Sequence, residues 1–379
     1  MGTTNRVKNC LFIILLVLMF LPMLQQQFGF VELKPLYGAI TKEQDPCFSV
    51  ESYIDESFQH QTEKYVNAEF GFRSTMIRIH NQIAFSLFDK TNAASVIIGK
   101  ENYLFDLGYT ESYFGKHFIG EDKIKEKLQK LKRIRDTLKT KNIDLLIIFA
   151  SGKPRFYPEF IPDQLVTAKT TSNYDCYLSN IKDTGIPYID FNDYFVKLKA
   201  TSPYCLYPQV GVHWSNYAAA LVGDSLNKYI LQLRNLKGTQ MIFKEIITRD
   251  SLSVEDKDAE EGCNLLFPIK KGKMSYPRIT FEEKGRIKPK TLMISDSFYW
   301  GILGSGIANQ IFENPIFWYY GHEVHGDGPT KKIENVNIKE QIEKQDVIML
   351  MASEGNLNIF PYEFIERMDS IYFSGNKKL

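Results

Sequence analysis

The amino-acid sequence predicts an α/β protein with a largely parallel sheet and helices on its faces. Apolar segments of strand length, at 143–150, 291–297 and 346–353, are separated by helix-like segments. Strands that alternate with helices are typical of parallel sheets that helices cover on both faces. The segment 143–150 is almost continuously apolar, as a strand buried on both faces should be. The chain has 379 residues, enough for one large domain or two small ones.

The N-terminus predicts a membrane anchor. Arg6 and Lys8 precede an apolar run from Cys10 to Leu24. A basic flank followed by an apolar run directs export and keeps the basic side in the cytoplasm. No small-residue cleavage pattern follows, so we favour a retained signal-anchor over a cleaved signal peptide. We therefore expect a single anchor in the cytoplasmic membrane at 1–28, a connector at 29–55 and an exported α/β domain at 56–379.

Hydrophobic periodicity predicts the remaining elements in chain order. We expect an amphipathic helix whose apolar positions run from Met76 to Leu87, a hairpin-like unit at 95–105, helices at about 121–140, 172–184 and 215–233, and further strands at 186–191 and 310–320. The acidic and polar segment 249–262 is interpreted as a surface loop. Ser215 is a candidate N-cap for the helix that follows it.

Charge and cysteine usage exclude some classes of function. The chain carries 46 basic and 45 acidic residues, so no basic excess supports nucleic-acid binding. No cysteine lies in a metal-binding spacing, and we expect no metal and no cofactor. Outside the anchor, Cys47, Cys176, Cys205 and Cys263 could form up to two disulfides or remain unpaired.

A serine directly after a predicted strand is the first candidate for chemistry. Active residues of open parallel sheets gather where the strands end. In LMISDSFYWG, Ser297 lies in such a turn, and N–H groups at the start of the following helix could stabilise an oxyanion. The alternative is that Asp296 or Ser297 only caps that helix.

A nucleophilic serine needs a base, because its hydroxyl is barely ionised at neutral pH. His213 lies between a turn rich in Pro and Gly and a helix start, and Trp214 beside it could hold the imidazole in place. A structural histidine would give the same pattern. A metal-dependent hydrolase that uses His322, His325 and Asp327 is a third, weaker interpretation.

These segments resemble a known family. GVHWSNYAA, followed by LMISDSF, is similar to the SGNH-hydrolase-like domain of the alginate O-acetylation proteins of the AlgJ/AlgX type, in which a D-x-H-W segment precedes a G-x-S or G-D-S serine. IIGKENYLF and SGKPRFYPEFIP resemble two further segments of that family. The resemblance covers roughly residues 56–370. It implies an SGNH-hydrolase-like fold with Ser297 as nucleophile and His213 as general base.

The resemblance also implies an oxyanion hole. EGNL resembles the asparagine block of SGNH enzymes, which would make Asn356 an oxyanion donor, and Gly321 would occupy the glycine block. Lys153, at the end of a strand, could pair with an acidic sugar or lie on the surface, and we favour the surface.

The chain departs from the family pattern at two positions. Gly211 stands where the family has an aspartate, and Ser295 stands where SGNH blocks have glycine. The acid of a triad fixes the tautomer of its histidine, so another group must replace it. Asp190 and Glu354 are the candidates.

The resemblance implies an enzyme that transfers acetyl groups to, or removes them from, a polysaccharide on the exported, periplasmic side. It also implies an acetyl donor supplied by a membrane-embedded acyltransferase partner. The alternative is a catalytically inactive carbohydrate-binding or assembly subunit of an exopolysaccharide-modifying complex, which kept the fold and lost the acid at Gly211.

Overall fold

The computed structural model describes residues 2–38 and 43–373, and the chain divides into two compact units. The first unit contains the residues up to Ala94 together with Glu260–Pro268. The second contains Ser95–Ala259 and the chain from Ile269 onward. The sequence places the beginning of the α/β domain at residue 56, whereas the compact unit that contains the sheet begins at Ser95.

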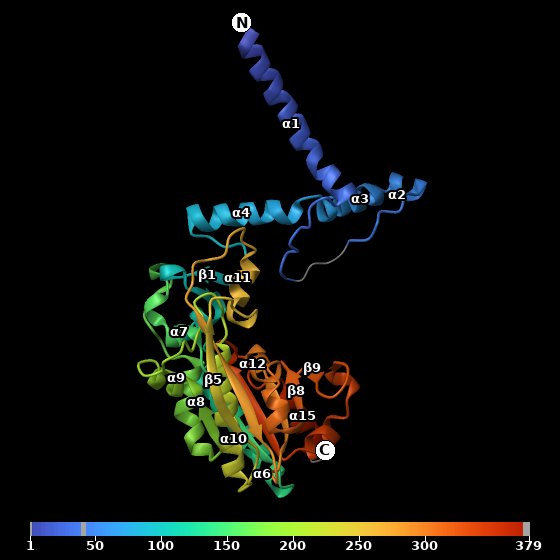
Figure 1. Cartoon of the computed structure of the whole chain (residues 1–379). Helices are drawn as coiled ribbons and strands as arrows, with labels where there is room; N and C mark the ends of the chain where they lie inside the picture. Colours follow the sequence, from blue (N-terminus) through green and yellow to red (C-terminus); the bar gives the residue numbers. More distant parts are fainter. Residues whose placement is uncertain (1, 39–42, 374–379) are drawn as a thin grey trace. The chain divides into compact units, whose positions relative to one another are not determined.

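The first unit consists mainly of helices. They are α1 (Gly2–Phe28), α2 (Val50–Ile54), α3 (Ser57–Glu69) and α4 (Arg73–Phe88), which Figure 1 labels. Residues Arg6–Phe28 of α1 are long and apolar enough to cross a membrane, which is consistent with a single-pass anchor. The turn between α3 and α4 includes Gly71 and Phe72, which has a left-handed φ of 63°.

A seven-stranded sheet organises the second unit, in the order β10-β9-β8-β7-β11-β3-β4. Strands β8 (Glu313–Tyr319), β7 (Lys290–Ser295), β11 (Val347–Ser353), β3 (Asp144–Ala150) and β4 (Tyr188–Asp190) are parallel. At one edge, β9 (Glu323–His325) pairs antiparallel with β8, and β10 (Lys331–Lys332) pairs antiparallel with β9. The predicted largely parallel α/β fold is confirmed.

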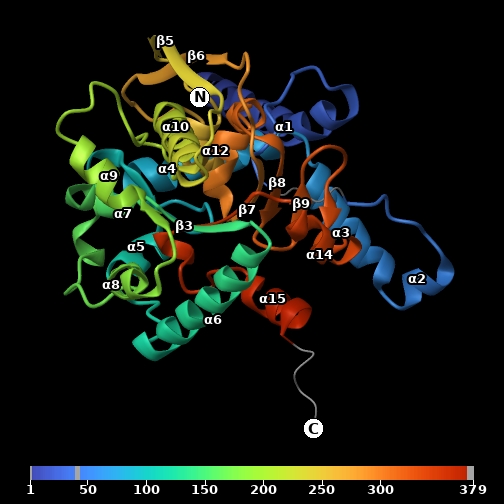
Figure 2. The ribbon, with the colours of Figure 1, turned by 90° about the horizontal axis from the view of Figure 1, so that it is seen from below.

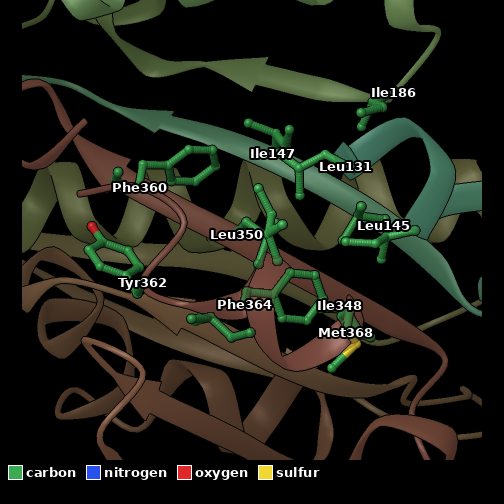
Figure 3. Packing of buried hydrophobic residues seen from close by; sticks show 14 of the residues in the cluster. Leu131, Leu145, Ile147, Ile186, Ile348, Leu350, Phe360, Tyr362, Phe364 and Met368 are labelled. Atoms are coloured by element: carbon green, nitrogen blue, oxygen red, sulfur yellow. The ribbon is translucent and has the colours of Figure 1, made fainter. Parts of the chain in front are cut away.

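Helices cover both faces of this sheet, because its central strands alternate apolar residues between two cores. Leu145 and Ile147 of β3 face one core, and Leu146 and Ile148 face the other. Figure 3 shows the first core, where Leu350 of β11 lies close to Ile147. Figure 2 shows the helices on the two faces. The first core uses α6 (Glu121–Thr140), α8 (Asn173–Ile181) and α15 (Phe364–Tyr372), and the second uses α9 (Phe191–Leu198), α10 (Asn216–Leu233), α12 (Trp300–Leu303) and α13 (Ile307–Ile311).

Two short sheets lie outside the main one. The expected hairpin at 95–105 is present as β1 (Val96–Ile98) and β2 (Leu104–Asp106), followed by α5 (Leu107–Tyr113). Strands β5 (Gln240–Arg249) and β6 (Met274–Glu282) form an antiparallel ribbon that the sequence analysis did not predict. Most positions of β5 are exposed or half-buried, so the strand lacks the apolar run that marked the central strands. The remaining short helices are α7 (Lys153–Phe156), α11 (Asp258–Cys263) and α14 (Ile338–Glu343).

Candidate functional site: a serine, histidine and aspartate at the carboxyl edge of the sheet

Ser297 lies at the carboxyl edge of the sheet, two residues after β7 ends. The chain leaves β7 at Ser295 and enters a 3₁₀ turn that begins at Ser297. The carboxylate of Asp296 accepts the N–H of Phe298 at 3.2 Å and so caps this turn. Because Asp296 takes the capping role, the Ser297 hydroxyl is not needed for it. The side chain of Ser297 is half-buried.

His213 reaches Ser297 from the loop that precedes α10. The Nε2 atom of His213 is 2.7 Å from the Oγ atom of Ser297. Directly after His213, the hydroxyl of Ser215 accepts the N–H of Ala218 at 3.1 Å and fixes the start of α10, as expected. The ring of Phe298 packs against the imidazole with centroids 4.8 Å apart, and Trp214 packs on Phe298 at 5.0 Å. Trp214 therefore supports the imidazole through Phe298.

Asp258 is the third member of the cluster, and it overturns the interpretation of 249–262 as a surface loop. Its Oδ2 atom is 2.5 Å from Nδ1 of His213. Its other oxygen, Oδ1, accepts the N–H groups of Val212 and Ala259, both at 2.8 Å. With a proton on Nδ1 held by Asp258, the neutral imidazole presents its Nε2 lone pair to Ser297. The acidic residues of this segment are therefore not all solvated, because Asp256 and Glu260 are buried and Asp258 faces His213.

The charges of this pair shift both pKa values. Burial by itself disfavours the charged imidazole, but the charge and hydrogen bond of Asp258 outweigh it, and the pKa of His213 is raised. Burial also disfavours the charged carboxylate, yet the contact with His213 and the two backbone N–H groups keep the pKa of Asp258 below its ordinary value. The arrangement stabilises an imidazolium next to the serine, which is what a general base must become during proton transfer.

Position 211, where the family has an aspartate, has little room for a side chain. A Cβ atom at Gly211 would lie 2.7 Å from Cγ of Pro208 and 3.0 Å from the backbone oxygen of Asp256. The ring of Pro208 and the backbone of Asp256 therefore crowd the space that a side chain at 211 would need. Asp258 comes from the same segment as Asp256.

Lys153 is buried, which corrects our expectation of a surface position. Its side chain is only 1% exposed. Its Nζ atom donates to the carbonyls of Leu104 at 2.6 Å, Gln209 at 2.9 Å and Gly211 at 2.7 Å. Burial lowers the pKa of Lys153 to about 7. Because two of the three carbonyls lie just before Val212 and His213, Lys153 holds the segment that carries the imidazole.

Asp190 and Glu354, the sequence candidates for the acid, are bound to other groups. Asp190 caps α9 through the N–H groups of Asn192 and Asp193, and its second oxygen accepts the hydroxyl of Tyr174 at 2.7 Å. Glu354 is buried and accepts two hydrogen bonds from Arg155, at 2.6 and 2.8 Å. Both carboxylates are engaged by structural partners, so neither orients His213.

Asn356 lies in a second polar cluster next to Ser297. Its Nδ2 atom is 2.9 Å from Oδ2 of Asp296 and 3.4 Å from the hydroxyl of Tyr320. Burial raises the pKa of Tyr320 to about 12, against smaller lowering contributions from hydrogen bonds with Asn356 and Ser297. Tyr320 is therefore a protonated hydroxyl beside the serine, and the sequence analysis did not identify it. No sequence signal marks it, because it follows β8 in an aromatic run.

Gly321 has a backbone role in the turn after β8. Its φ is +72°, and a Cβ atom there would lie 2.3 Å from the carbonyl oxygen of Tyr362. Only glycine combines this left-handed conformation with so close an approach. Its role as an oxyanion donor stays a prediction.

His322 and His325, which the sequence places in one loop, do not form a metal cluster, and His325 belongs to β9. His325 contacts the hydroxyl of Thr330 at 3.1 Å and packs against Trp300. Within 2–38 and 43–373, no group of three or more His, Cys, Asp or Glu side chains is arranged to hold a metal ion. All five cysteines are free thiols.

The second unit is similar to proteins of a known class. Residues 96–253 match the family model described as "SGNH hydrolase-like domain, acetyltransferase AlgX". The matched region includes His213 and ends before Asp258 and Ser297. The fold and this match define an SGNH-hydrolase-like α/β domain.

The curated relatives are more specific. The chain is 23% identical over 177 residues to the probable alginate O-acetylase AlgJ of Pseudomonas syringae pv. tomato, covering 46% of this chain and 43% of that protein. It is 23% identical over 164 residues to the probable alginate O-acetylase AlgJ of Azotobacter vinelandii, covering 43% of this chain and 40% of that protein. These matches therefore span less than half of each relative. Over the matched residues the chain is therefore similar to an AlgJ/AlgX-like domain.

Solved structures give lower similarity. The O-acetyltransferase domain of Pseudomonas putida AlgJ has 14% sequence identity and a TM-score of 0.47, covering 73% of this chain and 99% of that chain. Pseudomonas aeruginosa AlgX has 13% identity and a TM-score of 0.43, covering 72% of this chain and 66% of that chain.

Proposed function

We propose that this protein is a polysaccharide O-acetyltransferase in which Ser297 is the nucleophile, His213 the general base and Asp258 the group that orients and stabilises the imidazolium. The observation that carries the proposal is the continuous contact from Ser297 through His213 to Asp258, at 2.7 and 2.5 Å. The same three roles recur on unrelated folds that transfer acyl groups, and they are recognised by geometry. The acetyltransferase named in the matching family model supports the same reaction type.

The reaction proceeds in two half-reactions. In the first, the Oγ atom of Ser297 attacks the acetyl carbonyl of a donor while Nε2 of His213 takes the hydroxyl proton. The tetrahedral intermediate collapses, the donor's leaving group takes that proton, and an acetyl-serine ester remains. In the second, a sugar hydroxyl attacks the ester, His213 takes the sugar proton, and Ser297 leaves with it. The sum is transfer of one acetyl group from donor to sugar.

The second polar cluster next to Ser297 stabilises the oxyanion. Tyr320 is the first candidate donor, because burial keeps its hydroxyl protonated and it lies against both Ser297 and Asn356. The N–H groups at the start of the 3₁₀ turn and the amide of Asn356 are further donors. Donors that are already in place where negative charge develops cost no reorganisation during the reaction.

The names of the relatives support a polysaccharide as the acceptor. Two of them are named as probable alginate O-acetylases, so we assign an exported polysaccharide as acceptor. A helix that can span the membrane would hold the domain on the periplasmic side, beside a membrane-embedded partner that supplies the acetyl donor. The alternative of an inactive subunit was based on the missing acid at Gly211. With Asp258 beside His213, that observation no longer favours it.

The test is acetyl transfer by a serine variant. Ser297→Ala should reduce release of p-nitrophenol from its acetate ester, and acetylation of an added polysaccharide, by more than about 10³-fold. Ser305→Ala removes an exposed hydroxyl a few residues later and should keep wild-type rates. Unchanged turnover in Ser297→Ala would eliminate the mechanism. Release of p-nitrophenol without acetylation of any polysaccharide would leave an esterase.

A further inference from the structure

Helix α4 has the reverse of the ordinary polarity of a surface helix. Four apolar side chains spaced three and four residues apart, Met76, Ile79, Ile83 and Leu87, are between 43% and 72% exposed. This spacing places them in one stripe along the helix. The helices of water-soluble proteins normally bury such a stripe and expose the polar face.

Two polar side chains on the side of α4 away from the stripe, Arg78 and Asn81, are buried, and their contacts fix the helix in this orientation. The guanidinium of Arg78 donates to the carbonyls of Leu265 at 3.0 Å and Pro35 at 2.9 Å. Asn81 donates to the carbonyl of Cys263 at 2.9 Å. Rolling α4 to bury its stripe would break these bonds and leave the three carbonyls without these donors. The exposed stripe is therefore a stable feature of this unit.

The start of α4 is packed against the end of α1. A Cβ atom at Gly71 would lie 1.9 Å from the carbonyl oxygen of Pro22, so the backbone there touches the last turns of α1. The rings of Phe30 and Phe72 are also in contact, with centroids 6.0 Å apart. Within this unit, α4 runs crosswise to α1 (Figure 1). If α1 spans a bilayer, α4 begins at the level where the span ends and extends along the membrane plane.

We propose that the stripe of Met76, Ile79, Ile83 and Leu87 lies in the lipid bilayer surface, at the boundary between headgroups and acyl chains. Helices with an apolar stripe and a separate polar face bind in this position, with the apolar side about 5–10 Å deep. Residues 73–88 include the half-buried Arg73 and no acidic residue, so the helix is compatible with anionic headgroups. The unit thus holds the membrane by one spanning helix and one interfacial helix. This proposal depends on α1 as the anchor and is independent of the chemistry at Ser297.

The test places a tryptophan in the stripe of the full chain. The three native tryptophans all lie in the second unit, so Ile83→Trp and Met76→Trp each add a reporter to the first. Each variant is reconstituted in nanodiscs of phosphatidylcholine and phosphatidylglycerol, with and without lipids brominated close to the headgroup. Lys130→Trp, on the exposed face of α6, is the matched control. Thermal unfolding of each variant verifies that it folds like the wild type.

Bromination should quench the added emission of both stripe variants about twofold and leave that of Lys130→Trp unchanged. Bromine quenches only tryptophans close to it, and here it lies at the depth expected for an interfacial helix. Stripe variants that respond to bromine no more than the control would overturn the proposal. The proposal would also be overturned if the tryptophan emission were blue-shifted but not quenched by bromine, and each nanodisc held two copies of the chain. A second chain would then cover the stripe.

Discussion

Two carboxylates lie near Ser297, and their surroundings differ. Asp258 keeps 20% of its side chain exposed and directs one oxygen to the imidazole of His213. Asp296 is completely buried, although it is the immediate neighbour of Ser297 in the sequence. Its Oδ2 atom accepts the N–H of Ser353 at 2.8 Å and the hydroxyl of the same residue at 2.7 Å.

The difference separates a carboxylate that faces an imidazole from one that joins two strands. Asp296 joins the end of β7 to the end of β11. Its oxygens accept hydrogen bonds from neutral groups, namely backbone N–H groups and the amide of Asn356. Asp258 uses one oxygen for backbone N–H groups and leaves the other for His213. Proximity to Ser297 in the sequence therefore does not predict which carboxylate contacts His213. The two carboxylates are better distinguished by the hydrogen-bond partner of Oδ2, which is His213 for Asp258 and Ser353 for Asp296.

The largest expected effect comes from Asp258→Asn. An amide cannot stabilise the imidazolium and can hold the wrong tautomer, so kcat/KM should fall by about 10³–10⁴-fold while the fold is kept. Ester hydrolysis and acetyl transfer, with thermal unfolding as a check of folding, measure this. Asp250→Asn is the matched control, because Asp250 lies in the same segment with its side chain 78% exposed. Loss of less than about tenfold in Asp258→Asn would show that Asp258 does not assist the base.

Tyr320→Phe tests whether the cluster around Asp296 also takes part in the reaction. If the Tyr320 hydroxyl stabilises the oxyanion, its loss should lower kcat by about 10²–10³-fold, as for other single oxyanion donors. Tyr299→Phe removes another buried hydroxyl, which has no hydrogen-bond partner among the described residues, and should leave kcat unchanged. Equal kcat values in both variants would leave that cluster with a purely structural role.

The fold could be predicted from sequence because its central strands are marked locally. β3 and β11 each form a run buried at every position, and α6 repeats its apolar residues at helical spacing. The ribbon of β5 and β6 has no such mark. Its strands are stabilised by each other across an intervening segment of more than twenty residues, and much of their surface is exposed.

The site was only partly predictable for a related reason. Ser297 and His213 each lie at an element boundary, next to a strand end or a helix start, and boundaries can be read from sequence. Asp258 lies among five other acidic residues in 249–262, and nothing in the sequence separates it from them. Lys153 likewise resembles a surface lysine until the three carbonyls around it are seen. The roles of Asp258 and Lys153 can be recognised only from the distances between segments that lie far apart in the chain.

Asp296→Asn should affect stability more than chemistry. Its amide group would face the donors of Ser353, Asn356 and Phe298 with fewer acceptor atoms, and the free energy of unfolding should fall by about 1–3 kcal/mol. Chemical denaturation measures this, with Asp193→Asn as the control, since that carboxylate forms an exposed pair with Lys197. A fall of the same small size in both variants would contradict the structural role assigned to Asp296.

The smallest effect is a shift in pH dependence, and it tests the pair of His213 and Asp258 directly. The base works only when neutral, and the pKa of His213 is raised above its ordinary 6.5. The kcat/KM of the wild type should therefore rise with pH through a midpoint above 6.5. In Asp258→Asn the burial of the imidazole remains without the carboxylate, so the midpoint should move to lower pH.

The unfolding free energies of the wild type and of Asp258→Asn should also differ in their dependence on pH. A raised histidine pKa stabilises the fold below about pH 6.5, and this contribution is lost as the pH rises through the folded-state value. The lowered pKa of Asp258 stabilises the fold above about pH 4, and this contribution is lost as the pH falls through its folded-state value. The wild type should therefore exceed Asp258→Asn in unfolding free energy most clearly between these limits, when denaturation is followed across pH. A difference that does not vary with pH would mean that the two groups are not coupled, and Asp258 would then be a structural carboxylate like Asp296.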